Sequence, residues 1–172
     1  MSSSRRQRIL DLIARAEHPI TGTELATTLG VSRQIVVQDM AILRAAGADI
    51  IATPRGYLRA TPRGGRATYR EVLAVQHPRE MIEAELNALV DLGLRVIDVI
   101  VEHPVYGELR GALMLESRAD VKTFLGRLGD AEPLSVLTRG VHLHTVETSR
   151  PGAIEEGRQA LRQLGILLEG PG

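Results

Sequence analysis

Cysteine is absent from the chain, and aromatic residues make up only 2% of it. The first absence excludes disulfides, thiolate metal ligands and cysteine nucleophiles. The second means that any hydrophobic core is built from aliphatic side chains. No apolar run reaches the roughly 18 residues that a membrane-spanning helix needs, and the polar first residues are not typical of a signal peptide. We therefore expect a soluble, cytoplasmic protein with no membrane partner.

The two parts of the chain differ in charge, although the 172 residues have a formal net charge of zero. Residues 1–66 contain ten arginines and five acidic residues, which gives +5. Residues 67–172 contain eleven basic and sixteen acidic residues, which gives −5. This asymmetry favours a nucleic-acid-binding unit joined to a second unit with a different task.

The basic part has the pattern of three helices. Apolar residues from position 9 to 16 recur at intervals of three and four, as in a buried helical stripe. A short second helix ends at a glycine, and a third helix follows directly and continues to residue 45 or 46. The expected cap and stop residues are Thr21 or Thr23, Gly30 and Ser32. The candidates for the inner face of the third helix are Ile35, Met40, Ile42 and Leu43.

This order of helix, short helix, glycine turn and helix predicts a helix-turn-helix, whose second helix enters the major groove of DNA. Arginine forks onto guanine, glutamine onto adenine, and valine meets a thymine methyl group. Residues 49–59 predict two short strands around Arg55 and Gly56, a wing that reaches the DNA backbone or minor groove. The alternative, a winged helix that binds protein, is disfavoured by the surplus positive charge. The candidate DNA-binding residues are Ser32, Arg33, Gln34, Val37, Gln38, Arg44, Arg55 and Arg59.

Residues 61–68 contain a segment of proline, glycine and arginine without hydrophobic period, which predicts a linker between domains at 1–60 and 69–172. The second domain shows the order strand, helix, strand, strand, helix, strand, helix. This predicts an α/β fold, more narrowly α+β, with a ferredoxin-like split βαβ arrangement and an antiparallel sheet. Its expected strands are 69–76, 95–102, 109–115 and 141–148, and its expected helices are 79–92, 118–128 and 153–164.

Two histidines lie close together in the strand expected at residues 141–148. Because side chains alternate along a strand, His142 and His144 project from the same face. Neutral imidazole is the commonest metal ligand, and two on one rigid strand fix two ligand directions. The alternative for an isolated pair of this kind is two solvated histidines on a surface strand.

Further ligands come from the first strand and helix of the second domain. His77 ends the strand, and Glu85 lies on the helix, with Glu83 as the competing carboxylate. If the chain bends sharply at Pro78, three ring nitrogens and one carboxylate surround one ion. Such a set suits Ni, Zn, Fe, Co or Mn.

These motifs carry a family resemblance that covers nearly the whole chain. Residues 21–39 closely resemble the winged helix-turn-helix of bacterial metabolite-responsive repressors. The chain as a whole resembles the niacin-responsive repressors, whose C-terminal part is the three-histidine (3H) domain. The motifs of that domain are His77-Pro78, His103-Pro104-Val105-Tyr106-Gly107 and Gly140-Val141-His142-Leu143-His144.

The resemblance implies that the second domain senses nicotinic acid and that the protein represses genes of NAD synthesis and niacin uptake, with nicotinic acid as corepressor. It also implies a divalent metal ion at the positions that match the family's ligands. These positions are His77, Glu85, His142 and His144.

Nicotinic acid offers a pyridine nitrogen to a metal and a carboxylate to an arginine or a backbone amide. His103 and Tyr106 are candidates to line its pocket, while the alternative for His103 is a hydrogen-bonded residue that holds the following turn. The candidate partners of the carboxylate are Arg95, Arg110 and Arg139.

The sequence therefore predicts a repressor that binds a double-stranded DNA operator. We expect a homodimer, because paired recognition helices match half-sites about one DNA turn apart. One alternative is a winged-helix regulator of another metabolite. Another is a metal-dependent enzyme with an accessory DNA-binding domain, but no general base is evident beside the metal ligands. A regulator of the biotin protein ligase type needs a larger catalytic domain.

Overall fold

The structure, a computed structural model, describes residues 2–60 and 68–169. The chain divides into two compact units, Met1–Gly64 and Gly65–Gly172, and each is described by itself below. Most of the expected linker, residues 61–67, lies outside the described residues. Within the described part of the chain, no helix has the length and apolar character needed to cross a membrane.

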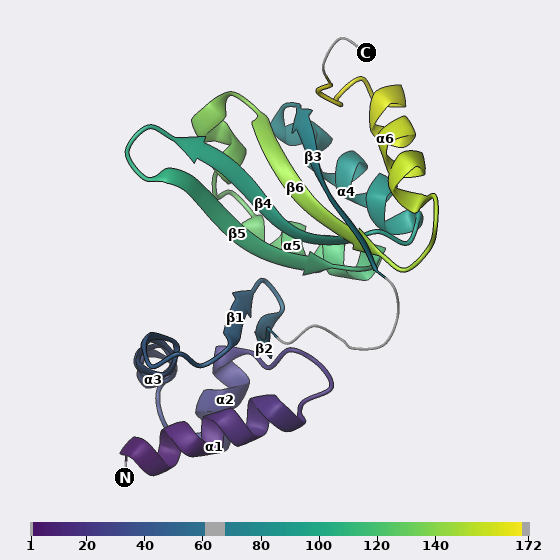
Figure 1. The fold of residues 1–172 in the computed structure, drawn as a ribbon. Helices are drawn as coiled ribbons and strands as arrows, with labels where there is room; N and C mark the ends of the chain where they lie inside the picture. The colour runs from purple at the N-terminus through teal and green to yellow at the C-terminus, as the bar shows by residue number, and fades with distance from the viewer. Residues whose placement is uncertain (1, 61–67, 170–172) are drawn as a thin grey trace. The chain divides into compact units, whose positions relative to one another are not determined.

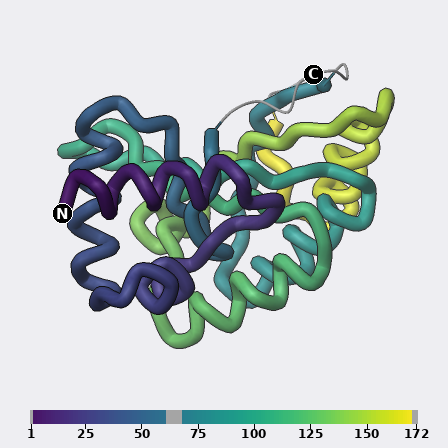
Figure 2. The backbone as a smooth tube through the Cα atoms, turned by 90° about the horizontal axis from the view of Figure 1, so that it is seen from below, coloured from purple at the N-terminus to yellow at the C-terminus, as the bar shows by residue number. Residues whose placement is uncertain are grey.

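The N-terminal unit combines three helices with a two-stranded antiparallel sheet, as expected for a winged helix-turn-helix (Figure 1). Helix α3 is seen nearly end-on in Figure 1, where α1 lies in the plane of the page, so their axes cross at a large angle. The same crossing is visible from below in Figure 2. The elements are α1 (Ser2–Arg15), α2 (Gly22–Leu29), α3 (Arg33–Ala45), β1 (Ile50–Thr53) and β2 (Gly56–Arg59).

Local sequence determines where α2 and α3 begin and end. Thr21 and Glu24 form a capping box in which each side chain accepts a hydrogen bond from the other residue's backbone N–H. Gly30 ends α2 in the left-handed conformation, with φ of 67°. Ser32 then caps α3 by accepting from the Ile35 N–H at 3.2 Å. These contacts satisfy backbone groups that a helix leaves unpaired at its ends.

The core of the N-terminal unit corrects one expectation about α3. Ile42 is 48% exposed, whereas Val36, which the sequence analysis did not place on the inner face, is fully buried. The buried stripe runs through Val36, Met40 and Leu43. Ile42 precedes Leu43 by one residue, and one residue turns the side chain by roughly 100° around the helix. It therefore leaves the buried face.

The C-terminal unit contains four long strands and three α-helices, together with two short 3-10 helices, among the residues described. The first and last strands of the unit in sequence, β3 and β6, have the expected bounds. The elements are β3 (Tyr69–Gln76), η1 (Arg79–Met81), α4 (Ile82–Asp91), β4 (Arg95–His103), β5 (Gly107–Leu115), α5 (Arg118–Leu128), η2 (Leu134–Thr138), β6 (Val141–Thr148) and α6 (Ala153–Gln163).

The sheet has the order β3-β6-β4-β5, and every neighbouring pair is antiparallel. Strands β3 and β4 are thus parallel with β6 between them, and β5 and β6 are parallel with β4 between them. The split βαβ arrangement is therefore confirmed. The two central strands, β4 and β6, are the second and fourth strands of the unit in sequence, whereas the central strands of a ferredoxin sheet are its first and third.

One face of this sheet carries the core of the unit. Helices α4, α5 and α6 lie on the same side of the strands (Figure 1). Fully buried leucines from α4 and α6 pack with those from β3 and β5, and Phe124 is the one aromatic residue beside them. The core is otherwise aliphatic, as the composition requires.

Two short helices depart from the predicted pattern. The single helix expected at residues 79–92 is a 3-10 turn, η1, followed by α4. Pro78 stands before η1 with extended backbone and starts the change of direction. The second 3-10 helix, η2, had no predicted counterpart because its five residues are too few for a helical period.

Candidate functional site

Strand β6 brings its two histidines to the helix-covered face of the sheet. His142 lies opposite Val75 and His144 lies opposite Leu73, and both partners belong to the aliphatic core. His77 follows β3 directly, and its backbone N–H donates to the Gly140 carbonyl at 3.3 Å. The ends of β3 and β6 therefore bring three imidazole rings together. The ring centroids of His142 lie 4.7 Å from those of His77 and 4.8 Å from those of His144.

Helix α4 supplies the carboxylate. The Glu85 carboxylate contacts all three rings: it pairs closely with His77 Nε2, lies 3.3 Å from His142 Nε2, and lies 2.9 Å from His144 Nε2. Glu85 is only 1% exposed, and the three histidines are 3–4% exposed. Glu83, the competing carboxylate, is exposed on α4. The sharp turn after β3 thus places Glu85, and not Glu83, among the histidines.

The other ring nitrogen of each histidine is fixed by the backbone. A carbonyl oxygen only accepts hydrogen bonds, so each Nδ1 carries a proton. Each Nε2 then faces Glu85 either as the second N–H of a charged ring or as a lone pair available to a metal. The three carbonyl partners of the Nδ1 atoms belong to Pro78 for His77 (2.8 Å), Gly140 for His142 (2.9 Å) and Asp98 for His144 (2.7 Å).

The charges in this cluster support one another. Burial raises the pKa of Glu85, but the charge of His144 and the close contacts with all three histidines outweigh it and hold that pKa well below its usual range. Burial lowers the pKa of His77 and of His144, yet their contacts with Glu85 outweigh this effect and raise both pKa values. The buried carboxylate therefore stays ionised and attracts positive charge.

These four residues fit a divalent transition metal. The ligand atoms of His77, Glu85 and His142 lie within 4.8 Å of one another. His144 Nε2 is buried, and despite its distance to Glu85 it lacks hydrogen-bond geometry. Three imidazoles with one carboxylate suit first-row metals better than calcium or magnesium, which prefer oxygen ligands. Histidine ligands whose second nitrogen donates to a carbonyl are typical of metal sites.

Asp98 is a contributor that the sequence analysis missed. Its carbonyl orients His144, and its carboxylate accepts from the Thr145 N–H at 2.9 Å and from Arg110 at 2.7 Å. The register between β4 and its neighbours shifts in this region, and the bulge lets Asp98 reach β6. An acidic residue within a strand of valine and isoleucine is the signal that marks it.

The two candidate ligand-binding residues lie at the tip of the β4–β5 hairpin. His103 Nδ1 accepts the backbone N–H groups of Val105 at 3.0 Å and Tyr106 at 3.2 Å. This is the turn-holding role that the sequence left open for His103. The Tyr106 ring is 74% exposed and its centroid lies 4.9 Å from that of His103. Their part in ligand binding stays a prediction.

The candidate DNA-binding residues lie mainly on the surface of the N-terminal unit. Ser32, Arg33, Gln34, Gln38 and Arg44 are exposed, as is Arg59 on β2. Val37 and Arg55 are partly buried. Ser32 uses its hydroxyl as the α3 cap, so its side chain has a structural role as well. Arg33, Gln34 and Gln38 lie in the first two turns of α3, whereas Arg44 lies in its last turn.

A buried charge on α3 was not foreseen. Asp39 is 2% exposed and accepts two hydrogen bonds from Arg5, at 2.5 and 3.2 Å, and one from Arg6 at 3.4 Å. The hydrogen bond from Arg5 is the main cause that lowers the pKa of Asp39 below its usual value. The pair fastens the start of α1 to the middle of α3. An acid at the spacing of the apolar stripe was its only signal in the sequence.

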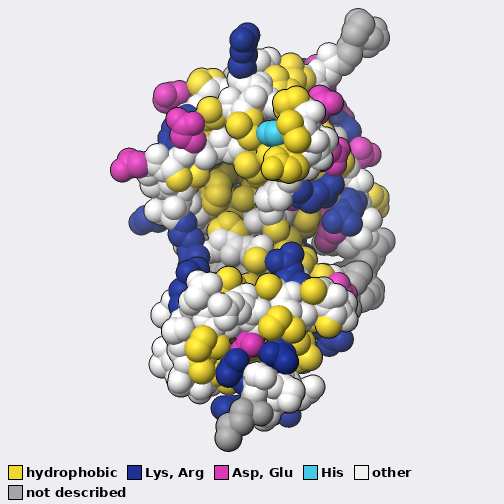
Figure 3. All heavy atoms as spheres, turned by 90° about the vertical axis from the view of Figure 1, so that its left-hand side faces the viewer, with side chains coloured by type: hydrophobic (Ala, Val, Ile, Leu, Met, Phe, Trp, Pro, Cys, Tyr) yellow, Lys and Arg dark blue, Asp and Glu magenta, His cyan; other side chains and the backbone are white. Residues whose placement is uncertain are grey.

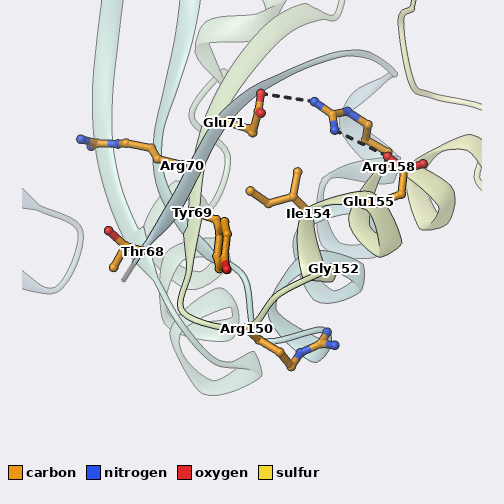
Figure 4. Close-up of a pocket in the computed structure, with 9 residues that line it drawn as sticks. All are labelled: Thr68, Tyr69, Arg70, Glu71, Arg150, Gly152, Ile154, Glu155 and Arg158. Carbon is orange, nitrogen blue, oxygen red and sulfur yellow. Dashed lines mark hydrogen bonds and ion pairs between the residues drawn. The ribbon is translucent and has the colours of Figure 1, made fainter. Parts of the chain in front are cut away.

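A separate hollow of about 470 Å³ lies between the start of β3 and the start of α6 (Figure 4). Tyr69 and Ile154 provide its apolar side chains. Arg158 pairs with Glu71 at 3.3 Å and with Glu155 at 3.6 Å. Its positive charge is thus already balanced, and the histidine cluster does not line this hollow.

Comparisons with known proteins agree with this division. Residues 5–58 match the family model of an HTH domain, and residues 70–170 match that of the 3H domain. The chain is 42% identical to the probable transcription repressor NiaR of Thermotoga maritima, over 98% of this chain and 98% of the relative. It is 39% identical to the transcription repressor NadR of Bacillus subtilis, over 98% of this chain and 96% of the relative.

Proposed function

The chain belongs to the family of transcription repressors that join an HTH domain to a 3H domain, and from this premise we propose that it is a DNA-binding repressor controlled by nicotinic acid. Both relatives are named as transcription repressors, which agrees with the interpretation as a regulator rather than an enzyme. The genes proposed to be repressed are those of NAD synthesis and niacin uptake, as the family resemblance implies.

The observation that carries the sensor proposal is the convergence of His77, Glu85, His142 and His144 in a buried cluster. These residues would hold one divalent ion of the Ni, Zn, Fe, Co or Mn group. Such an ion supplies a Lewis-acidic coordination position for a nitrogen or oxygen ligand. The chain itself fixes the ring orientations through the three backbone carbonyls and excludes water from the ligands by burying them.

For the DNA-binding half, the proposal rests on the exposed polar residues at the start of α3 and on the positive charge of the unit. The proposed readers of bases are Arg33, Gln34, Val37 and Gln38. Arg44 is proposed to contact a phosphate, and Arg55 or Arg59 of the wing to reach the DNA backbone or the minor groove. A homodimer would present two such helices to an operator with two half-sites. Nicotinic acid acts as corepressor if it binds the DNA-competent state more tightly, with a coupling of roughly 1–3 kcal/mol.

The proposed function is tested with metal-loaded full-length protein. Calorimetry measures binding of nicotinic acid, with nicotinamide as the matched neutral ligand. Duplexes selected from a random library then measure DNA affinity with and without nicotinic acid, and we expect a roughly 5- to 150-fold gain. The variant His142→Ala with His144→Ala should lose both the metal and the response. Wild-type protein that holds metal but binds no nicotinic acid would leave a repressor with a different effector.

A further inference from the structure

Arg139 has an unusual backbone conformation beside the histidine cluster. Its φ of 53° and ψ of 40° are left-handed, and Met114 is the one other non-glycine residue of the described chain with positive φ. Arg139 ends η2, a position where glycine or asparagine is the usual choice. Glycine would adopt this backbone conformation with less strain than arginine. The presence of arginine here therefore suggests a role for its side chain.

The peptide that carries Arg139 is held by the same groups that orient the cluster. The Arg139 carbonyl accepts from Gln76 Nε2 at 3.3 Å. The next residue, Gly140, accepts from His77 N–H and from His142 Nδ1, and its own N–H donates to Ser135 at 2.8 Å. The Arg139 side chain thus starts from a fixed backbone, one residue away from the carbonyl that holds the His77 backbone and orients the His142 ring.

Among the three candidate arginines, Arg139 is the one whose guanidinium has no ion pair within the described part of the chain. Arg95 lies 3.0 Å from Glu116, and Arg110 lies 2.7 Å from Asp98. Arg79, close in sequence to His77, donates to backbone carbonyls. Arg139 is exposed, and its guanidinium has no ion pair or hydrogen bond with any residue between 2–60 and 68–169.

Apolar side chains surround this free charge in the sequence. Val136 is 48% exposed and Leu137 56% exposed on η2, and Val141, at the start of β6, is 37% exposed. In Figure 3, hydrophobic side chains gather in the upper part of the view, where the end of the β4–β5 hairpin faces the reader. A guanidinium with no partner among the described residues, and with exposed apolar residues near it in the sequence, suits a small acid with an apolar ring, because guanidinium and carboxylate form paired hydrogen bonds.

We propose that Arg139 binds the carboxylate of the effector and makes the sensor select the acid over its neutral amide. This inference rests on the proposed function, since it assigns the selectivity of the same site. It also ranks three arginines that the sequence left equal.

The test compares full-length, metal-loaded wild type with Arg139→Gly, Arg139→Lys and Arg127→Ala. Arg127 is an exposed arginine on α5, so its loss removes the same charge from the same unit. Calorimetry measures nicotinic acid and nicotinamide against each protein. We expect Arg139→Gly to bind nicotinic acid at least about tenfold more weakly and to lose its preference over the amide. Arg139→Lys should recover part of the affinity, and Arg127→Ala should match the wild type.

Stability and metal content separate a binding role from a structural one. Because glycine suits the left-handed position, Arg139→Gly should melt at the wild-type temperature or above it and hold as much metal. A variant that loses affinity only together with stability or metal would overturn the inference. Equal nicotinic acid binding by wild type and Arg139→Gly would also overturn it while leaving the proposed function intact. No binding by the wild type would remove the proposed function itself.

Discussion

Both units of the chain have a buried carboxylate that contacts two or more basic side chains, Asp39 in one and Glu85 in the other, but the partners of these carboxylates differ in kind. In the N-terminal unit, Asp39 is 2% exposed and is paired with Arg5 and Arg6, whose side chains reach solvent. Arginine stays charged at any ordinary pH. The charge of Asp39 is therefore already neutralised by permanently charged partners, and this cluster needs no metal ion.

In the C-terminal unit, Glu85 faces three histidines that are as buried as itself. Histidine changes charge near neutral pH and binds metals when it loses its proton. All three Nδ1 atoms are already bound to carbonyls, so three Nε2 atoms and the carboxylate share one small space. A buried carboxylate therefore indicates a metal site only when its partners, like histidine and unlike arginine, can lose a proton and bind a metal instead.

The largest expected effect comes from a matched pair of glycines, one in each unit. A Cβ on Gly140, with φ of 91°, would lie 2.5 Å from the His77 carbonyl oxygen, and a Cβ on Gly56, with φ of 124°, would lie 2.6 Å from the Ile20 carbonyl oxygen. Backbone strain and overpacking add, so each change to alanine should lower the free energy of unfolding of its unit by about 3–5 kcal/mol.

Metal affinity distinguishes the two glycine variants. Gly140→Ala displaces the carbonyl that orients His142, so we expect roughly 10- to 100-fold weaker metal binding. Gly56→Ala should leave metal affinity unchanged. Denaturant unfolding, monitored by hydrogen exchange in each unit, measures the two free energies of unfolding. Metal titration of the folded protein measures the metal affinity. Equal metal loss in the two variants would contradict the assignment of Gly140 to the cluster.

Removal of metal should act on one unit alone. When free metal is about 100 times its dissociation constant, a chelator lowers the free energy of unfolding of the C-terminal unit by about 2.7 kcal/mol. Hydrogen exchange should show no change in the N-terminal unit, because Asp39 is already paired. The control is His142→Ala with His144→Ala, which should not respond to the chelator. A chelator response in that variant would place the metal elsewhere.

Sequence patterns predicted the elements of this site better than its contacts. Strands β3 and β6 have their expected bounds because alternation and flanking prolines or glycines mark them clearly. Face alternation likewise placed His142 and His144 together. Spacing alone left Glu83 as a competitor of Glu85, and it was the family resemblance that favoured Glu85. Spacing could not decide because the choice depends on how η1 turns the chain after Pro78.

Other contacts were missed because they join residues that are far apart in sequence. Asp39 meets Arg5 across two helices, and Asp98 reaches Thr145 through a bulge that no pattern encodes. The error at Ile42 has a simpler cause, since two adjacent apolar residues near the end of a helix do not both face its core. The helical period predicts which side of the helix is buried, but it does not decide which of two adjacent apolar residues in the last turns lies on that side.

A smaller effect is expected from acid, which should lower the free energy of unfolding of the N-terminal unit by protonating Asp39. The folded pKa of Asp39 lies below its unfolded value, so its stabilisation is present above about pH 3.9 and is lost as pH falls through the folded pKa. At neutral pH, Asp39→Asn should cost about 1–2 kcal/mol. The cost should shrink towards zero in acid. Unfolding of both proteins against pH measures it, and a cost that does not depend on pH would exclude a charge effect.

The smallest effect concerns the weaker of the two arginines. Arg6 meets Asp39 through one contact of 3.4 Å, so Arg6→Ala should change the free energy of unfolding by no more than about 0.5 kcal/mol. Arg5→Ala should cost about 1–2 kcal/mol, because it removes two charge-assisted hydrogen bonds.

The double variant shows whether the two arginines share one task. When one is removed, the other still neutralises Asp39, but without both the buried carboxylate is unpaired. Arg5→Ala with Arg6→Ala should therefore cost more than the two single changes added together, as residues that share a partner do. A double-mutant cycle by denaturant unfolding measures the excess. Simple additivity would mean that each arginine acts on its own, and that the pairing of Asp39 does not depend on a second arginine in reserve.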